Sequence, residues 1–368
     1  MILSALIVLA CAFLLTFLVA PVVIEVATRN GIYDRPNQRK IHPRRVSSLG
    51  GVSILVGFLI TCLFFIPFSS DSEIRLYLAT GVVVFLLGLK DDLSDLSAKN
   101  KLIGQLFIAA VIIHGGGLRL ESLYGFLGIN EVPELFSYII TYMTIIVVMN
   151  AFNLIDGVDG LASGLAIVSL TVFGIYFLYA AQPAYALMAF SLVGSILAFL
   201  AFNFPPARIF MGDSGSLLIG TVNAILVIRF IHTASSPASV LPIPGAVAVG
   251  FSVLFVPLFD TFRVFSMRLM MGLSPFQPDR KHVHHLLLNR GYNHFWTSFI
   301  CITTNIIFLL LAWRFKFYGS TWLLLAEMVF GFVLVGVLYY GWIPAKRVAE
   351  AVEVPVIQME REAGIKAE

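Results

Sequence analysis

The sequence predicts an all-α polytopic membrane protein. Of its 368 residues, 59% are hydrophobic and only 12% are charged, and the mean hydropathy is +0.92. A soluble domain is about half apolar, whereas the apolar runs of this chain recur at close to the ~20 residues that a membrane helix needs. We therefore expect about eleven transmembrane helices.

The expected helices follow the apolar runs in chain order. They cover residues 2–26, 50–68, 76–89, 102–117, 136–152, 163–180, 184–202, 216–232, 245–260, 296–313 and 320–342. The run at 76–89 is short for a full crossing. The first run has no basic segment before it and no small-residue cleavage site, so we expect a retained helix. We expect residues 1–343 to form one transmembrane domain and residues 344–368 a cytoplasmic tail.

Basic residues are concentrated on one side of this topology. With eleven spans, the loops of one side and the C-terminal tail hold 19 of the 24 Lys and Arg residues. The positive-inside rule places that side in the cytoplasm. The N-terminus is then outside and the C-terminus cytoplasmic.

The most informative polar cluster is Asn150–Gly160 (NAFNLIDGVDG), which follows an apolar run on the predicted cytoplasmic side. On a continuing helix, Asn150, Asn153 and Asp156 share roughly one side, as do Asp156 and Asp159. A helix cap would use fewer polar groups, and polar residues at a membrane helix end are functional candidates. This cluster predicts a cradle for a metal ion and phosphates at the membrane surface.

Two further acidic motifs lie on the same side. Asp91 and Asp92 are adjacent carboxylates, which can hold Mg²⁺ or accept a proton; a solvated helix end is the simpler alternative. The segment FMGDSGS at 210–216 begins a helix. Asp213 could cap that helix, or the free backbone N–H groups there could bind phosphate. The predicted active site therefore lies in the cytoplasmic loops.

A basic histidine segment completes the set, with the sequence DRKHVHH at 279–285. A zinc site would need a matching set of Cys or His partners, which the chain lacks. Arg280, His282, His284 and His285 suit diphosphate oxygens better, because they supply hydrogen-bond donors and positive charge.

Together these groups have the composition that phosphoryl transfer requires, since that reaction depends on positioning and on neutralising charge. A soluble anionic donor would enter from the cytoplasm and a lipid acceptor from the bilayer. A transporter is the alternative class. Transporters usually bind substrate near the bilayer midplane, often between repeated halves, whereas these ionisable groups crowd one surface and the sequence shows no repeat.

With these motifs in order, the chain resembles the polyprenyl-phosphate N-acetylhexosamine-1-phosphate transferases. The similarity runs from about residue 30 to 290 and includes KDD at 90–92, the Asn/Asp motif at 150–162, FMGDSGS and the histidine motif. The histidine motif is similar to that of the bacterial undecaprenyl-phosphate N-acetylglucosamine-1-phosphate transferases, which start O-antigen, enterobacterial common antigen or teichoic acid assembly. The branch that transfers phospho-N-acetylmuramyl-pentapeptide carries three consecutive histidines instead.

The resemblance implies a reaction and its partners. UDP-N-acetylglucosamine and undecaprenyl phosphate would give undecaprenyl-diphospho-N-acetylglucosamine and UMP. Mg²⁺ would be the cofactor, with Mn²⁺ as a substitute, at the cytoplasmic face of the bacterial inner membrane. Another UDP-N-acetylhexosamine, including UDP-N-acetylmuramyl-pentapeptide, is the alternative donor. A homodimer would be in keeping with the family, and we expect no nucleic-acid partner.

The resemblance also implies roles for individual residues. Asn153 and Asp213 would hold the metal. Asp91 and Asp92 would be catalytic on the acceptor side, and Asp156 and Asp159 on the donor side. The substrate-binding residues would be Lys40, Lys101, Asn150, Asn203, Arg280, His282, His284 and His285. We favour direct attack by the acceptor phosphate over a covalent phospho-aspartate, because a phosphate with a second pKa near ~6 is largely dianionic at neutral pH.

Overall fold

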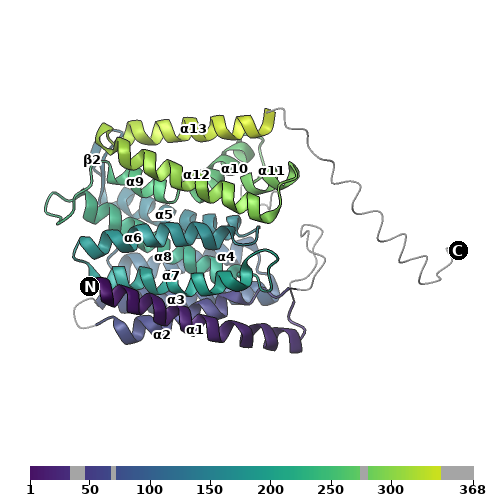
Figure 1. Cartoon of the computed structure of the whole chain (residues 1–368). Coiled ribbons are helices and arrows are strands. Elements are labelled where there is room, and N and C mark those ends of the chain that lie inside the picture. Colours follow the sequence, from purple (N-terminus) through teal and green to yellow (C-terminus); the bar gives the residue numbers. More distant parts are fainter. Residues whose placement is uncertain (34–45, 68–71, 274–280, 341–368) are drawn as a thin grey trace.

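The computed structural model describes residues 1–33, 46–67, 72–273 and 281–340, and Figure 1 shows them as a bundle of long helices. The helices are α1 (Ile2–Arg29), α2 (Gly50–Phe65), α3 (Ser72–Ser94), α4 (Ala98–Ala110), α5 (Glu134–Ile155), α6 (Leu161–Tyr179), α7 (Pro183–Asn203), α8 (Gly212–Ser235), α9 (Ala246–Val253), α10 (Phe255–Met270), α11 (Val283–Asn289), α12 (His294–Phe315) and α13 (Ser320–Tyr340). A π-helical turn, η1 (Val111–Gly115), continues α4, and a 3₁₀ turn, η2 (Lys316–Tyr318), follows α12.

Helices occupy all eleven segments that the sequence predicts as apolar runs. Seven helices in the described part of the chain are long and apolar enough to cross a membrane, and α9 with α10 would make an eighth as one bent span. The other segments are shorter or more polar, because α2 has 16 residues, α4 has 13 and α3 carries Lys90, Asp91 and Asp92 in its last turns. The protein is thus a polytopic helical membrane protein, and eleven crossings remain a prediction.

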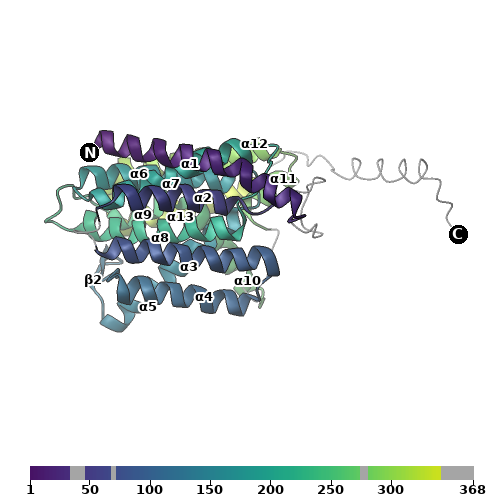
Figure 2. The same ribbon diagram turned by 90° about the horizontal axis from the view of Figure 1, so that it is seen from below.

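Helix α8 lies at the centre of the bundle. Its apolar stretch is 94% buried, whereas those of α1 and α13 are 22% buried and lie at the periphery (Figures 1 and 2). Glycines let other helices approach α8 closely, as small residues do in membrane bundles. A Cβ on Gly88 of α3 would lie 2.5 Å from the Cα of Ser214 in α8. This contact brings the end of α3 against the start of α8.

The predicted span at 245–260 is divided by a break at Leu254, where α9 and α10 meet at 86°. Pro257 has no N–H for the Val253 carbonyl, which a continuous helix would require. Asn305 of α12 replaces that donor, because its Nδ2 donates to Val253 O at 3.0 Å. Its Oδ1 also accepts from Val256 N at 2.9 Å. The side chain of one helix therefore satisfies the broken backbone of another.

A small hairpin is the exception to the predicted all-α fold. Strands β1 (Ser122–Phe126) and β2 (Ile129–Glu131) pair antiparallel, with Leu127 and Gly128 at positive φ in the connection. The hairpin lies at the end of the bundle that holds the N-terminus (Figure 1). The helix ends described below meet at the opposite end.

Candidate active site

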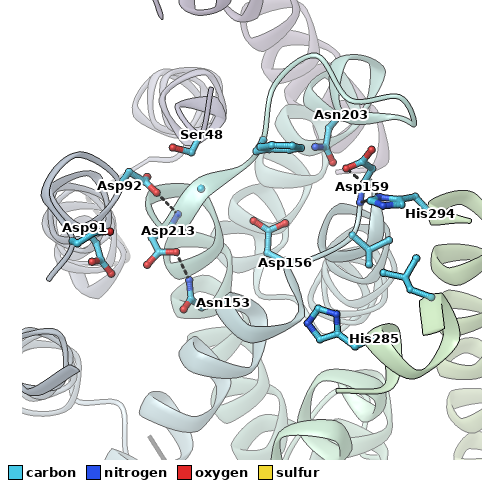
Figure 3. Close-up of a pocket in the computed structure, with 16 residues that line it drawn as sticks. Ser48, Asp91, Asp92, Asn153, Asp156, Asp159, Asn203, Asp213, His285 and His294 are labelled. Carbon is cyan, nitrogen blue, oxygen red and sulfur yellow. Dashed lines mark hydrogen bonds and ion pairs between the residues drawn. The ribbon is translucent and has the colours of Figure 1, made fainter. Parts of the chain in front are cut away.

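Eight of the predicted site residues line a cavity of about 360 Å³ at one end of the bundle (Figure 3). The ends of α3 and α5, the starts of α8 and α12, the α7–α8 loop and α11 form its wall. Six aspartates line it: Asp91, Asp92, Asp95, Asp156, Asp159 and Asp213. Asn153, Asn203, His285 and His294 line it as well. The cavity therefore collects acidic groups from segments that are far apart in the sequence.

Asp92 caps the start of α8. Its Oδ1 accepts from Asp213 N at 2.8 Å, and its Oδ2 accepts from Ser214 N at 3.0 Å. A carboxylate is favoured at a helix N-terminus, where backbone N–H groups lack partners. Gly212 precedes these amides with φ +72°, and a Cβ there would meet Ser48 O at 2.1 Å. Burial, with the negative charge of Asp213, raises the pKa of Asp92 to about 7.

Lys101, in the first turn of α4, connects three oxygens from three other helices. Its Nζ lies 3.0 Å from Asp91 Oδ2, donates to Asn153 Oδ1 at 3.1 Å, and also contacts Asp213 Oδ2. Asn153 Nδ2 donates to Asp213 Oδ1 at 2.8 Å and to Ser216 Oγ at 3.0 Å. Burial and the neighbouring Asp213 raise the pKa of Asp91, against the effect of Lys101. The structure thus brings together the predicted residues Asp91, Lys101, Asn153 and Asp213.

This cluster fits a divalent cation by the chemistry of its donors. Within the described residues, no three His, Cys, Asp or Glu side chains are arranged to hold a metal. The oxygens of Asp91, Asn153 and Asp213 nevertheless converge on one cationic group, the ammonium of Lys101. Carboxylate and amide oxygens are the protein ligands that Mg²⁺ prefers. Asp213 and Asn153 would be its ligands here.

Asp159 and Asn203 hold the turn that follows α5. Asp159 is only 5% exposed; its Oδ2 accepts from Ala207 N at 3.3 Å, and its carbonyl accepts from Ser298 Oγ at 2.9 Å. Asn203 Oδ1 accepts from Gly160 N at 2.9 Å. Asp156 ends α5 and is directed toward the middle of the cavity in Figure 3. The four predicted catalytic aspartates therefore have different environments.

The start of α12 supplies a residue that sequence reasoning missed. His294 lines the cavity, and its Nδ1 lies 3.4 Å from Asp159 Oδ1 and accepts from Asp159 N at 3.3 Å. It belongs to none of the motifs, and nothing in the sequence around it distinguishes it from a surface histidine.

Only one residue of the described histidine segment lines the cavity, namely His285. His282 is buried, and its Nδ1 lies 2.9 Å from Asp260 Oδ2. Asp260 also accepts from Val283 N at 3.1 Å and from Arg263 Nη2 at 2.8 Å. This buried network fixes the start of α11, and Asp260 was a polar residue to which the sequence assigned no role.

His284 is 1% exposed and packs beneath the turn after α5. A Cβ on Gly157 would lie 2.8 Å from His284 Nε2, so the contact requires glycine. Burial, with the charge of His285, lowers the pKa of His284 to about 3, and the ring is neutral at physiological pH. The structure therefore places His282 and His284 behind the cavity wall.

Asn150 also lies away from the cavity lining. It exchanges two hydrogen bonds with Gln105 of α4, at 3.1 and 2.9 Å. This pair joins α4 to α5, which keeps Lys101 close to Asn153. The predicted substrate-binding residues Lys40 and Arg280 lie outside the described residues.

Fold and site together define a polytopic membrane protein with an acidic site built from helix ends at one end of the bundle. The sequence model of glycosyl transferase family 4 matches residues 74–231. The chain is 31% identical over 321 residues to the undecaprenyl-phosphate alpha-N-acetylglucosaminyl 1-phosphate transferase of Yersinia pestis, with 85% of each chain covered. It is 32% identical over 324 residues to the enzyme of that name from Escherichia coli strain K12, covering 85% of this chain and 84% of the relative.

A Bacillus subtilis relative, the probable undecaprenyl-phosphate N-acetylglucosaminyl 1-phosphate transferase, is 29% identical over 302 residues, or 81% of each chain. The chain belongs to glycosyl transferase family 4. The family resemblance predicted from the motifs is confirmed.

Proposed function

We propose that the protein transfers N-acetylglucosamine-1-phosphate from UDP-N-acetylglucosamine to undecaprenyl phosphate and releases UMP. The observation that carries this proposal is the cluster of Asp91, Lys101, Asn153 and Asp213 at the start of α8. It combines metal-binding oxygens with a cation at the N-terminus of a helix, which suits two phosphate-bearing substrates. The names of the relatives support the donor sugar and the lipid acceptor.

In the proposed reaction, an oxygen of the acceptor phosphate attacks the β-phosphorus of the donor. The bond from that phosphorus to the bridging oxygen breaks, and UMP leaves with the electron pair. Asp91 and Asp92 would lie on the acceptor side, with Lys101 neutralising the acceptor phosphate. A pKa of about 7 at Asp92 suits a group that takes the last proton from a phosphate monoester near neutral pH.

We further propose that Asp213 and Asn153 bind Mg²⁺, which would supply charge neutralisation at the donor diphosphate. Asp213→Asn should weaken Mn²⁺ binding to the purified protein at least about tenfold and abolish turnover, because a neutral amide replaces a charged ligand. Electron paramagnetic resonance of free Mn²⁺ measures the affinity without turnover. Equal Mn²⁺ affinity in the variant and the wild type would remove Asp213 from the metal site.

We propose that the cavity faces the cytoplasm of the bacterial cell, at the inner membrane. The predicted eleven-span topology places 19 of the 24 Lys and Arg residues on the side that holds the polar motifs, which supports this orientation. The cavity would then open to the compartment that supplies the nucleotide sugar.

The test is UMP release by detergent-purified protein with Mg²⁺, undecaprenyl phosphate and a panel of UDP-sugars. We expect release with UDP-N-acetylglucosamine, and loss of release on adding EDTA. Release with a different UDP-sugar alone would keep the reaction type and change the donor. No release with any sugar, from protein shown to be folded, would overturn the proposal.

A further inference from the structure

The cavity has two chemically different sides. Asp91, Asp92 and Asp213 lie on one side, and His285 and His294 lie on the other (Figure 3). Among the described residues of the cavity lining, these two histidines are the only basic side chains. A donor diphosphate that enters between so many carboxylates needs hydrogen-bond donors on its own side.

The orientation of the His294 ring is set by Asp159. The backbone nitrogen of Asp159 lies 3.3 Å from His294 Nδ1, so this nitrogen faces Asp159 and the Nε2 end of the ring is directed away from it. The Asp159 carboxylate lies 3.4 Å from the same nitrogen. Asp159 is in turn fixed by Ala207 N and Ser298 Oγ. The ring retains 20% exposure at the cavity.

We propose that His294 binds the donor, its Nε2–H donating a hydrogen bond to the diphosphate of the nucleotide sugar, and that Asp159 is its positioning residue. This inference rests on the proposed function. It assigns to the imidazole side of the cavity the part of the donor diphosphate that faces away from the metal-binding residues Asn153 and Asp213, and the acceptor phosphate to Lys101. It also extends the site to a residue outside the four sequence motifs.

Steady-state kinetics of UMP release test this role. His294→Ala should raise the KM for UDP-N-acetylglucosamine about tenfold, as expected for one hydrogen bond to a charged group. The KM for undecaprenyl phosphate and kcat should stay within about twofold. His114→Ala is the matched control, because His114 is exposed and contacts Tyr142 in a different part of the bundle.

Two amide variants separate donor binding from a purely structural role. The amide nitrogen of His294→Gln reaches close to the Nε2 position, whereas the shorter side chain of His294→Asn reaches only the Nδ1 position and keeps the contact to Asp159. Donor binding through Nε2 predicts that Gln restores a low donor KM and that Asn does not. The opposite order, with kcat and both KM values changing together, would overturn the proposal.

Failure of this inference is distinguishable from failure of the proposed function. An unchanged donor KM in His294→Ala, in a preparation whose wild type releases UMP, would reject the role of His294 alone. A wild-type protein that is folded but releases no UMP from any UDP-sugar would reject the proposed function itself.

Discussion

At the scale of single residues, the aspartates of the cavity have different roles, and each role depends on the groups that the carboxylate contacts. The family resemblance implied catalytic roles for four aspartates, two on the acceptor side and two on the donor side. In the structure, Asp92 caps a helix, Asp91 pairs with Lys101, Asp159 is buried under hydrogen bonds, and Asp156 lines the cavity. The motifs predicted eight of the residues that line the cavity, whereas Asn150, His282 and His284 lie outside its lining. The motifs could not predict these roles, because the partners come from distant segments such as the loop that holds Ala207.

The raised pKa of Asp92 predicts a pH-dependent stability. Its carboxyl group has a pKa of about 7 in the folded protein and an ordinary value of 3.8. The folded protein thus holds a proton that the unfolded chain releases between these values. The stabilising contribution of this proton is complete below about pH 4 and is lost as the pH rises through about 7.

Asp92→Asn removes this dependence. The melting temperature of the wild type, relative to that of the variant, should therefore fall between pH 5 and pH 8 in detergent solution. Asp95→Asn is the control, because Asp95 follows the same helix and is exposed. If the difference in melting temperature between the wild type and Asp92→Asn is the same at pH 5 and at pH 8, the raised pKa of Asp92 is contradicted.

At the scale of helices, close approach and helix breaks determine where the functional ends lie. The apolar runs predicted the helices because each must satisfy its own backbone in lipid. The break at Leu254 and the position of α11 escaped prediction, because they depend on hydrogen bonds made by Asn305 and Asp260 to distant segments of the chain. An apolar run in the sequence indicates that a segment is buried or in the membrane. It does not indicate which distant side chains hydrogen-bond to that segment.

Gly88→Ala should separate α3 from α8. A Cβ at this position would lie 2.5 to 2.6 Å from the backbone of Asp213 and Ser214. A change of side-chain rotamer cannot remove this clash, because the atoms belong to the backbone. We expect a loss of about 1–3 kcal/mol of stability, typical of overpacking, and at least about tenfold lower kcat, because Asp92 loses its position. Gly81→Ala is the control on the same helix pair, where the nearest atom is Leu218 Cδ1 at 3.3 Å. Equal effects of the two substitutions on kcat would disprove the argument.

Asn305→Leu should destabilise the bend between α9 and α10. The substitution keeps a similar volume but removes the donor to Val253 O and the acceptor for Val256 N, both of which are buried. Each unsatisfied group costs roughly 1–3 kcal/mol. Thermal unfolding in detergent should show a melting temperature lower by several degrees. A variant as stable as the wild type would mean that other groups satisfy the break.

At the scale of the whole molecule, the sequence predicted a one-sided arrangement of polar motifs, and the structure brings those motifs to one end of the bundle. Single cysteines test the orientation that we propose. Lys99→Cys, next to the cavity side, should react with a membrane-impermeant thiol reagent only after cells are opened. Ala238→Cys, in the exposed loop after α8, should react in intact cells. The reverse labelling pattern would show that the cavity faces the outside of the cell.

The wide spacing of the cavity residues along the chain has a consequence for biosynthesis. The acidic side is complete once the start of α8 has been made, since it draws on residues from Asp91 to Ser216. The opposite wall requires His285 and His294, about 70 residues further on. A nascent chain that ends just after the start of α8 therefore holds every residue of the acidic side and lacks the facing wall. The wall of the cavity is complete only once the start of α12 has been made.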